Sequence, residues 1–163
     1  MNTIYFYSDR AAYGCFSNFS AHGITLNGRW WPTSEHYFQA QKFAGTPHEE
    51  AIREAKTPKQ AATMGRERTR PLRPDWEQVK DEVMREAVRQ KFLAHADIRQ
   101  ILLDTGDAPI VENAPGDYYW GIGADGSGKN MLGRILMEVR DELRFNHPAL
   151  TVIEQADLGI DSE

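Results

Sequence analysis

The segment Trp31–Phe43, WPTSEHYFQAQKF, constrains the fold more than any other stretch of the chain. After Pro32, either Thr33 or Ser34 can cap a helix, and the pattern predicts that this helix runs to about Phe43. Its apolar side chains are spread around the whole cylinder, so no clean polar face remains. A helix of this kind must be largely buried, and its polar side chains therefore cannot all face water.

Three polar residues of this predicted helix, Glu35, Gln39 and Lys42, are spaced i, i+4 and i+7 and share one face. A carboxylate and an amine on one half-buried face suit acid–base or covalent chemistry. Simpler roles exist for both: Glu35 is also a first-turn acid favoured by the helix dipole, and Lys42 is also a lysine that extends its amine to solvent. The spacing by itself favours these simpler roles.

The rest of the chain predicts a few short strands and several helices. The expected strands are Ile4–Tyr7, a hairpin over Ile24–Trp31 with a tight turn at Asn27-Gly28, Pro109–Glu112 and Tyr118–Trp120. The expected helices are His48–Ala55, Pro58–Met64, Asp75–Leu93, Ala96–Leu103 and Asn130–Phe145. Strands and helices do not alternate regularly, so we expect a mixed single domain of a few short strands and many helices over residues 4–145. The acidic segment 146–163 is weakly patterned and is expected to be a peripheral tail.

Composition excludes several classes of protein. The 163 residues suit one domain, and 24 acidic against 19 basic residues give a net charge of -5, which argues against a general nucleic-acid binder. Cys15 is the single cysteine and the histidines show no metal-binding spacing, so we expect no metal and no disulfide. No signal peptide and no apolar run of about 20 residues is visible, so the expected location is cytoplasmic, without membrane insertion.

The glycine-rich stretch Gly123–Asn130, GADGSGKN, is close to a nucleotide-binding P-loop but has Asn130 where the P-loop needs a hydroxyl. Gly121, Gly123 and Gly126 also spell G-x-G-x-x-G, but no βαβ unit surrounds them. Neither nucleotide motif is therefore predicted. The simplest interpretation is a flexible loop with Asn130 as the cap of the last helix. An alternative is that backbone N–H groups at this helix start bind a phosphate or a ribose.

Two further clusters combine aromatic and polar residues. Trp76 begins the longest predicted helix with Lys80 one turn later, and its indole belongs either to the core or to a surface that stacks on a base. The segment ENAPGDYYWG brings Glu112, Asn113, Asp117 and Trp120 together just before the glycine loop. Asp117 suits an ordinary turn, and carboxylates with aromatic rings also suit a pocket for a sugar attached to a ring.

Five sequence blocks, occurring in order, resemble the YbiA-like family, which is also called NADAR for its proposed link to NAD and ADP-ribose. They are GCFSNFS, NGRWWPTSEHYFQAQKF, REAVRQKF, ILLDTGDAPIVENAPGDYYWGIG and GKNMLGRILMEVR, and the match runs from about Ile4 to Leu143. The resemblance implies an α+β, mostly helical fold. It also implies an N-glycosidase, which cleaves the bond between a ribose C1 and a nitrogen. One branch acts on phosphoribosylated pyrimidine intermediates of riboflavin biosynthesis, and another removes ADP-ribose from modified guanine.

The residues that match the family's motifs are Asn18, Glu35, Lys42, Trp76, Asp117 and Asn130. The resemblance implies that Glu35 is the main catalytic carboxylate, which stabilises an oxocarbenium-like state, and that Asp117 holds ribose hydroxyls or assists. Lys42 then donates a proton to the leaving group or acts as a Schiff-base amine. We expect substrate contacts from Trp76 and Trp120, and phosphate or ribose contacts from Asn18, Gly126 and Asn130. No cofactor is expected.

The predicted function is therefore hydrolysis of phosphoribosylated pyrimidine intermediates of riboflavin biosynthesis, with release of ribose 5-phosphate. One alternative is an ADP-ribosyl-guanine glycosidase, which performs the same chemistry on a different leaving group. The other is a non-catalytic ADP-ribose-binding module. Such a module would not need the catalytic acids, so the presence of Glu35 and Asp117 argues against it. The expected partner in every case is a small molecule.

Overall fold

The computed structural model describes residues 2–145. Its helices are the 3-10 helix η1 (Gly14–Phe16) and the α-helices α1 (Ser34–Gln41), α2 (Pro47–Arg53), α3 (Pro58–Arg66), α4 (Trp76–Ala94), α5 (Ala96–Asp104) and α6 (Met131–Phe145). Its strands are β1 (Ile4–Phe6), β2 (Ile24–Leu26), β3 (Arg29–Trp31) and β4 (Ile110–Glu112). The predicted α+β, mostly helical fold is confirmed. The predicted acidic tail, 146–163, lies outside the described residues.

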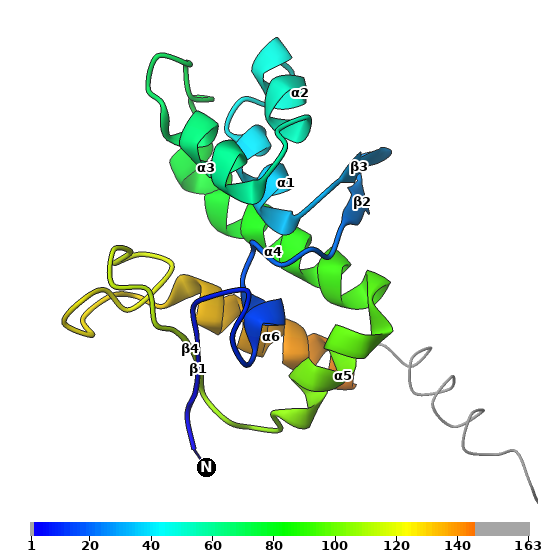
Figure 1. The fold of residues 1–163 in the computed structure, drawn as a ribbon, viewed down its shortest axis with the longest axis vertical. Helices are drawn as coiled ribbons and strands as arrows, with labels where there is room; N and C mark the ends of the chain where they lie inside the picture. Colours follow the sequence, from blue (N-terminus) through cyan, green and yellow to red (C-terminus); the bar gives the residue numbers. More distant parts are fainter. Residues whose placement is uncertain (1, 146–163) are drawn as a thin grey trace, which may run out of the picture.

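The long helix α4 runs through the middle of the molecule and separates two groups of elements (Figure 1). Helices α1, α2 and α3 and the β2–β3 hairpin lie on one side, and β1, β4, α5 and α6 lie on the other. Each side has its own apolar core: Met84, Val88 and Phe92 of α4 belong to one core, and Ala87 belongs to the other. Helix α4 is thus the shared wall of both cores.

Strands β1 and β4 form a parallel pair in which Ile4 is opposite Ile110 and Phe6 is opposite Glu112. The expected strand Tyr118–Trp120 is wrong: these residues form a series of bends. The carbonyl groups of Tyr119 and Trp120 accept hydrogen bonds from the N–H groups of Met131 and Leu132. These N–H groups begin α6 and have no partner within the helix. The bent segment therefore supplies the carbonyl groups that accept their hydrogen bonds.

The hairpin β2–β3 forms as predicted from its Asn27-Gly28 pair. Both turn residues have positive φ, 55° for Asn27 and 73° for Gly28, as a two-residue turn that follows the strand twist requires. At the base of the hairpin, the buried indole of Trp31 donates a hydrogen bond from Nε1 to the carbonyl of Leu26 over 3.1 Å.

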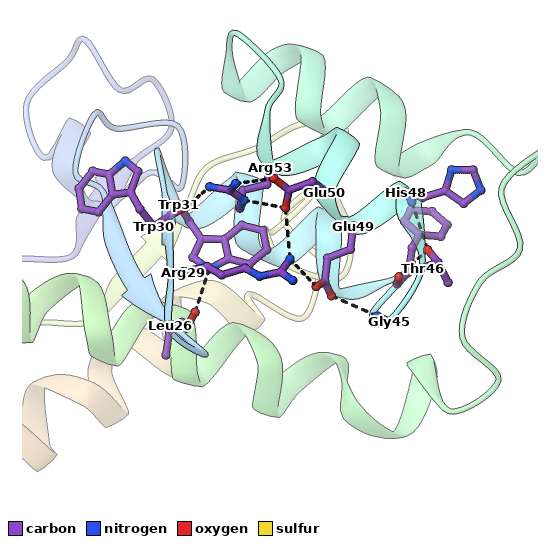
Figure 2. Close-up of polar contacts among 11 residues, drawn as sticks. Leu26, Arg29, Trp30, Trp31, Gly45, Thr46, His48, Glu49, Glu50 and Arg53 are labelled. Carbon is purple, nitrogen blue, oxygen red and sulfur yellow. Dashed lines mark hydrogen bonds and ion pairs between the residues drawn. The ribbon is translucent and has the colours of Figure 1, made fainter.

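Charged groups tie this hairpin to α2, as Figure 2 shows. Arg29 Nη1 lies 3.3 Å from Glu49 Oε1 and 3.2 Å from Glu50 Oε2. Arg53 donates from Nη1 to the carbonyl of Trp30 over 3.1 Å and also pairs with Glu50. Exposed ion pairs add little stability each, so we assign these contacts to the orientation of α2 rather than to its stability.

Asn130 occupies the cap position of α6, where its carbonyl accepts the backbone N–H of Arg134 over 3.0 Å. Its φ is 53°, and its side-chain amide hydrogen-bonds to β4 rather than to the N–H groups of the first turn of α6. Asn130 Oδ1 accepts the backbone N–H of Glu112 over 2.9 Å, and Asn130 Nδ2 donates to the carbonyl of Ile110 over 3.0 Å. The side-chain amide therefore replaces a neighbouring strand along one edge of β4.

We predict that Asn130→Gly lowers the free energy of unfolding by about 1–3 kcal/mol, because two backbone groups of β4 lose their partner. Glycine tolerates positive φ, so this variant isolates the side chain from backbone strain. Urea denaturation measures the change. The control is Asn113→Ala, since Asn113 is exposed one residue beyond β4 and should change stability by less than about 0.5 kcal/mol. Equal losses for both variants would contradict the assigned role.

Candidate active site

A cavity of about 1160 Å³ opens where α1, α3 and the first turns of α4 meet the loop between β4 and α6. Six of the eight predicted site residues line it, and they come from four separate parts of the chain. These six are Asn18, Glu35, Lys42, Trp76, Asp117 and Trp120. The fold therefore brings together residues that are up to about a hundred positions apart in the sequence.

The other two predicted site residues, Gly126 and Asn130, are not among the residues that line this cavity. The backbone N–H of Asn130 donates to the carbonyl of Gly121 over 3.0 Å, and the next two N–H groups donate to Tyr119 and Trp120. These amides at the start of α6 are therefore already hydrogen-bonded within the protein. The structure does not join Gly126 and Asn130 to the other six residues.

Helix α1 is buried along its whole length, as its sequence predicts. Burial of polar groups is costly unless they are hydrogen-bonded, and several of them have partners. His36 Nε2 lies 2.9 Å from the carbonyl of Ala55, and His36 Nδ1 lies 2.8 Å from Thr33 Oγ1. A carbonyl only accepts, so Nε2 carries the proton and Nδ1 accepts from the Thr33 hydroxyl. Burial also lowers the pKa of His36, which agrees with a neutral ring.

Glu35 lies in the first turn of α1 and is 6% exposed. Its Oε1 accepts a hydrogen bond from Gln39 Nε2 over 2.8 Å. Burial raises the pKa of Glu35, while the Gln39 hydrogen bond and the positive charges of Arg66 and Lys42 act in the opposite direction. Glu35 is thus a desolvated acid whose charged form is favoured by one hydrogen bond and two cations, and in that charged form it can stabilise positive charge on a substrate.

Asn18 fixes the start of α1. Its carbonyl accepts the backbone N–H of Glu35 over 3.2 Å, and its Oδ1 accepts the hydroxyl of Ser34 over 2.9 Å. Among the described residues, the hydrogen-bond partner of Asn18 Nδ2 is the sulfur of Met84, at 3.3 Å, which is a weak acceptor. The amide of Asn18 therefore keeps donor capacity for a ligand while its oxygen positions the helix that carries Glu35.

Lys42 follows the last residue of α1 and lies beneath the aromatic side chains of the cavity. Its Nζ is 3.4 Å from the carbonyl of Gly65 and 5.7 Å from the centre of the Phe38 ring. Burial lowers the pKa of Lys42 to about 8, and the neighbouring charge of Arg68 acts in the same direction. At neutral pH a fraction of this amine is unprotonated, which suits proton transfer or attack on an aldehyde.

Aromatic rings form another wall of the cavity. The ring centre of Phe38 lies 5.2 Å from Trp76 and 5.2 Å from Trp120. Trp76 is 6% exposed and belongs to the core, whereas Trp120 is only half-buried. The core interpretation of Trp76 therefore holds, although the residue also lines the cavity. Trp120 has the larger free surface for a flat ligand.

Asp117 forms a turn and lines the cavity at the same time. Its Oδ1 accepts the backbone N–H groups of Tyr119 over 3.0 Å and Trp120 over 2.8 Å. This arrangement is the ordinary turn role that aspartate often has. The same two hydrogen bonds hold the carboxylate still, so the turn role and a substrate role are compatible.

The sequence grouped Glu112 with Asp117 but assigned it no role. Glu112 ends β4 and lines the cavity. Burial, together with the negative charges of Asp117 and Glu35, raises the pKa of Glu112 to about 8. The signal for this residue was its spacing of five from Asp117 across a Pro-Gly turn, but a sequence does not show which side of a turn faces a cavity.

The sequence also gave no role to one face of α3. Lys59, Thr63 and Arg66 are spaced i, i+4 and i+7, line the cavity and are exposed, which places them toward its opening. Gly65 lets α3 approach α1 closely, because a Cβ at this position would lie 2.0 Å from Gln39 Oε1. The hydroxyl of Thr63 donates to the carbonyl of Lys59 over 3.0 Å, so this face offers the two cations to an anionic ligand.

Within residues 2–145, no group of three or more His, Cys, Asp or Glu side chains is arranged to hold a metal ion. In the same part of the chain, no helix has both the length and the apolar character needed to cross a membrane.

Comparison with known proteins identifies relatives of the chain. The NADAR domain model matches residues 5–144. An N-glycosidase of Nostoc punctiforme is 55% identical over 145 residues, which cover 87% of this chain and 93% of the relative. The N-glycosidase YbiA of Escherichia coli is 54% identical over 140 residues, which cover 86% of this chain and 88% of the relative.

Two further comparisons concern structure and pathway. The NMR structure of E. coli YbiA matches with a TM-score of 0.83 and 52% sequence identity, and the match covers 89% of this chain and 86% of that one. A protein of Vibrio vulnificus named a riboflavin biosynthesis protein is 44% identical over 145 residues, which cover 89% of this chain and 40% of the relative. The YbiA-like fold expected from the sequence is confirmed.

We predict that Gln39→Leu raises the pKa of Glu35 further, because a hydrogen bond to the carboxylate favours its charged form. Titration of the glutamate carboxyl carbons by NMR measures this pKa without any substrate. Gln41→Leu is the matched control, since Gln41 is also buried on α1 but does not act on Glu35. A Glu35 pKa that is the same in wild type and Gln39→Leu would show that the hydrogen bond has no electrostatic effect.

Proposed function

The chain belongs to the NADAR family and is an N-glycosidase, and from this we propose that it hydrolyses the ribose C1–N bond of phosphoribosylated pyrimidine intermediates of riboflavin biosynthesis. The products are ribose 5-phosphate and the free heterocycle. We further propose residues 4–145 as the glycosidase domain. The observation that carries the proposal is that Glu35 and Asp117 share one cavity with the cationic face of α3.

The two carboxylates suit the charge that develops during this reaction. Breaking an N-glycosidic bond places positive charge on the ribose ring, and a nearby carboxylate stabilises that state. We assign this role to Glu35, which is buried and held by Gln39. Asp117 is fixed by two backbone amides and is assigned to the ribose hydroxyls or to the attacking water.

The exposed face of α3 suits the phosphate of such a substrate. In the part of the chain that the structure describes, neither Lys59 nor Arg66 pairs with a carboxylate within 4.0 Å, in contrast to Arg70, Arg73, Arg85 and Arg89. Both therefore have charge available for an anion. A substrate whose phosphate binds on this face would have its ribose C1 directed toward the buried carboxylates.

The aromatic wall suits the heterocycle. Phe38 and Trp120 line the cavity together with Tyr118 and Tyr119, and flat rings bind well beside aromatic side chains. The printed name of the Vibrio vulnificus relative refers to riboflavin biosynthesis, which supports a pyrimidine of that pathway as the leaving group. Lys42 lies below this wall and is assigned either to proton transfer or to a Schiff base with an opened ribose.

The cavity volume supports a second candidate function, which is the removal of ADP-ribose from modified guanine. Pockets for drug-sized ligands are about 300–1,000 Å³, and this cavity reaches about 1160 Å³. The volume therefore admits an ADP-ribosylated guanine as well as the smaller phosphoribosylated pyrimidine. The chemistry at the ribose C1 would be the same, with Glu35 in the same role.

We predict that wild type releases ribose 5-phosphate from a phosphoribosylaminopyrimidine and that Glu35→Gln lowers kcat by about 10²-fold or more. Chromatography of the released sugar phosphate measures both rates, and ADP-ribosylated guanosine serves as the second substrate. The matched control is Glu82→Gln, whose exposed side chain pairs with Arg85 away from the cavity.

Each outcome of this assay assigns a function. Release of ADP-ribose alone would move the activity to the second candidate. Release of neither product, with tight binding of ADP-ribose, would contradict catalysis on these substrates and favour a binding module.

We also predict that Arg66→Gln raises KM for the phosphorylated substrate by about 10–100-fold, as expected for the loss of a charge-assisted hydrogen bond of about 1.5–3 kcal/mol. The same variant should leave KM for the dephosphorylated nucleoside analogue unchanged. Arg134→Gln is the control, since Arg134 is exposed on α6 and does not line the cavity. If Arg66→Gln weakens both substrates equally, the phosphate does not bind at α3.

A further inference from the structure

Among the described residues, Oε2 of Glu112 lacks the kind of hydrogen-bond donor that the carboxyls of Glu35 and Asp117 have. Glu35 accepts a hydrogen bond from Gln39, and Asp117 accepts two from backbone amides. In contrast, Glu112 Oε2 is buried and has no hydrogen-bond partner among the described residues. A buried carboxyl without a donor is more stable when it is protonated, since the neutral form is less costly to desolvate.

The charged surroundings of Glu112 favour the same state. The charged groups that face the cavity are Glu35 and Lys42 from the α1 region, Lys59 and Arg66 from α3, the Glu77–Lys80 ion pair from α4, and Asp9 and Asp117 from loops. Of these, Asp117 and Glu35 act on Glu112, and both are negative. The cations Arg66 and Lys42 act instead on Glu35. The cavity thus separates its carboxyls into one with positive neighbours and one without.

The backbone holds Glu112 in place. Its N–H donates to Asn130 Oδ1 over 2.9 Å, and its carbonyl accepts the N–H of Ile122 over 3.0 Å. The next residue, Asn113, donates its N–H to the carbonyl of Phe6 over 2.8 Å. A group that transfers a proton must keep its position relative to the substrate, and these contacts provide that rigidity.

We propose that Glu112 is the general acid of the reaction, which gives its carboxyl proton to the nitrogen that leaves the ribose. The inference rests on the proposed function and identifies the proton donor for that same site. Glu35 has a hydrogen bond and two cations that favour its charged form, whereas the charges that act on Glu112 disfavour its charged form. Carboxyls whose surroundings differ in this way are typical of acid and base assignments in hydrolases.

The step balances without a further reactant. The Glu112 proton moves to the glycosidic nitrogen as the C1–N bond breaks and its electron pair stays on that nitrogen. Water then bonds to C1 and gives up one proton, which restores the protonated state of the carboxyls in the cavity. The ribose leaves as ribose 5-phosphate, and the heterocycle leaves as the neutral amine.

Two substrates with the same sugar test this role. The first is the phosphoribosylaminopyrimidine, whose nitrogen needs a proton to leave. The second is 4-nitrophenyl ribofuranoside 5-phosphate, whose nitrophenolate leaves without one. We expect Glu112→Gln to lower kcat about 10²–10⁴-fold on the first substrate and to change kcat only a few-fold on the second. Circular dichroism and thermal unfolding confirm that the variant folds, and Glu82→Gln is again the control.

The pH dependence separates Glu112 from Lys42. In wild type, kcat/KM on the first substrate should fall as pH rises through about 8, because Glu112 loses its proton there. This alkaline limb should disappear in Glu112→Gln. A variant that keeps the rate and the limb would overturn the role and assign the proton to Lys42, whose pKa is also about 8.

These experiments distinguish a failure of the proposed function from a failure of the role assigned to Glu112. A wild type that cleaves neither substrate would contradict the proposed function and this role with it. An active wild type with a fully active Glu112→Gln would contradict this role alone. Difference infrared spectra of wild type against Glu112→Gln give a readout without substrate: a protonated carboxyl band at pH 7 is expected, and its absence would also overturn the role.

Discussion

The burial of α1 is the constraint on which the rest of the structure depends. A helix that carries serine, glutamate, histidine and glutamine is stable inside a protein only when these groups find partners there. Thr33, Ala55 and Asn18 supply them, and each belongs to a segment that would otherwise be an ordinary loop. The loops around α1 are therefore placed by the polar groups of the helix as much as by apolar packing.

This burial also creates the chemistry of the site. Loss of water raises the pKa of Glu35 and lowers the pKa of Lys42 to about 8, because the charged form of each is less well solvated inside the protein. Helix α4 closes the cavity with Trp76, while α3 contributes cations from the exposed side. The opening of the cavity therefore carries available positive charge, whereas desolvated carboxyls lie deeper inside.

Local patterns predicted the parts of the fold that local physics decides. The Asn27-Gly28 turn follows from the positive φ values that such a turn needs, and the buried α1 follows from apolar residues on every side. The bends at Tyr118–Trp120 were missed, because their carbonyl groups serve the start of α6, a contact that only the folded chain defines. Asparagine is a favoured residue at a helix cap, but the side-chain amide of Asn130 hydrogen-bonds to β4 instead.

The same distinction applies to the site. The i, i+4, i+7 spacing placed Glu35, Gln39 and Lys42 on one face, since helix geometry fixes that relation. Glu112 and the face of α3 depend on which elements meet across the cavity, and no spacing within one element reveals this. The most direct test is a crystal structure of Glu35→Gln with an uncleaved phosphoribosylaminopyrimidine. The account predicts the phosphate against Lys59 and Arg66 and the ribose C1 beside residue 35; a phosphate bound at the start of α6 instead would contradict it.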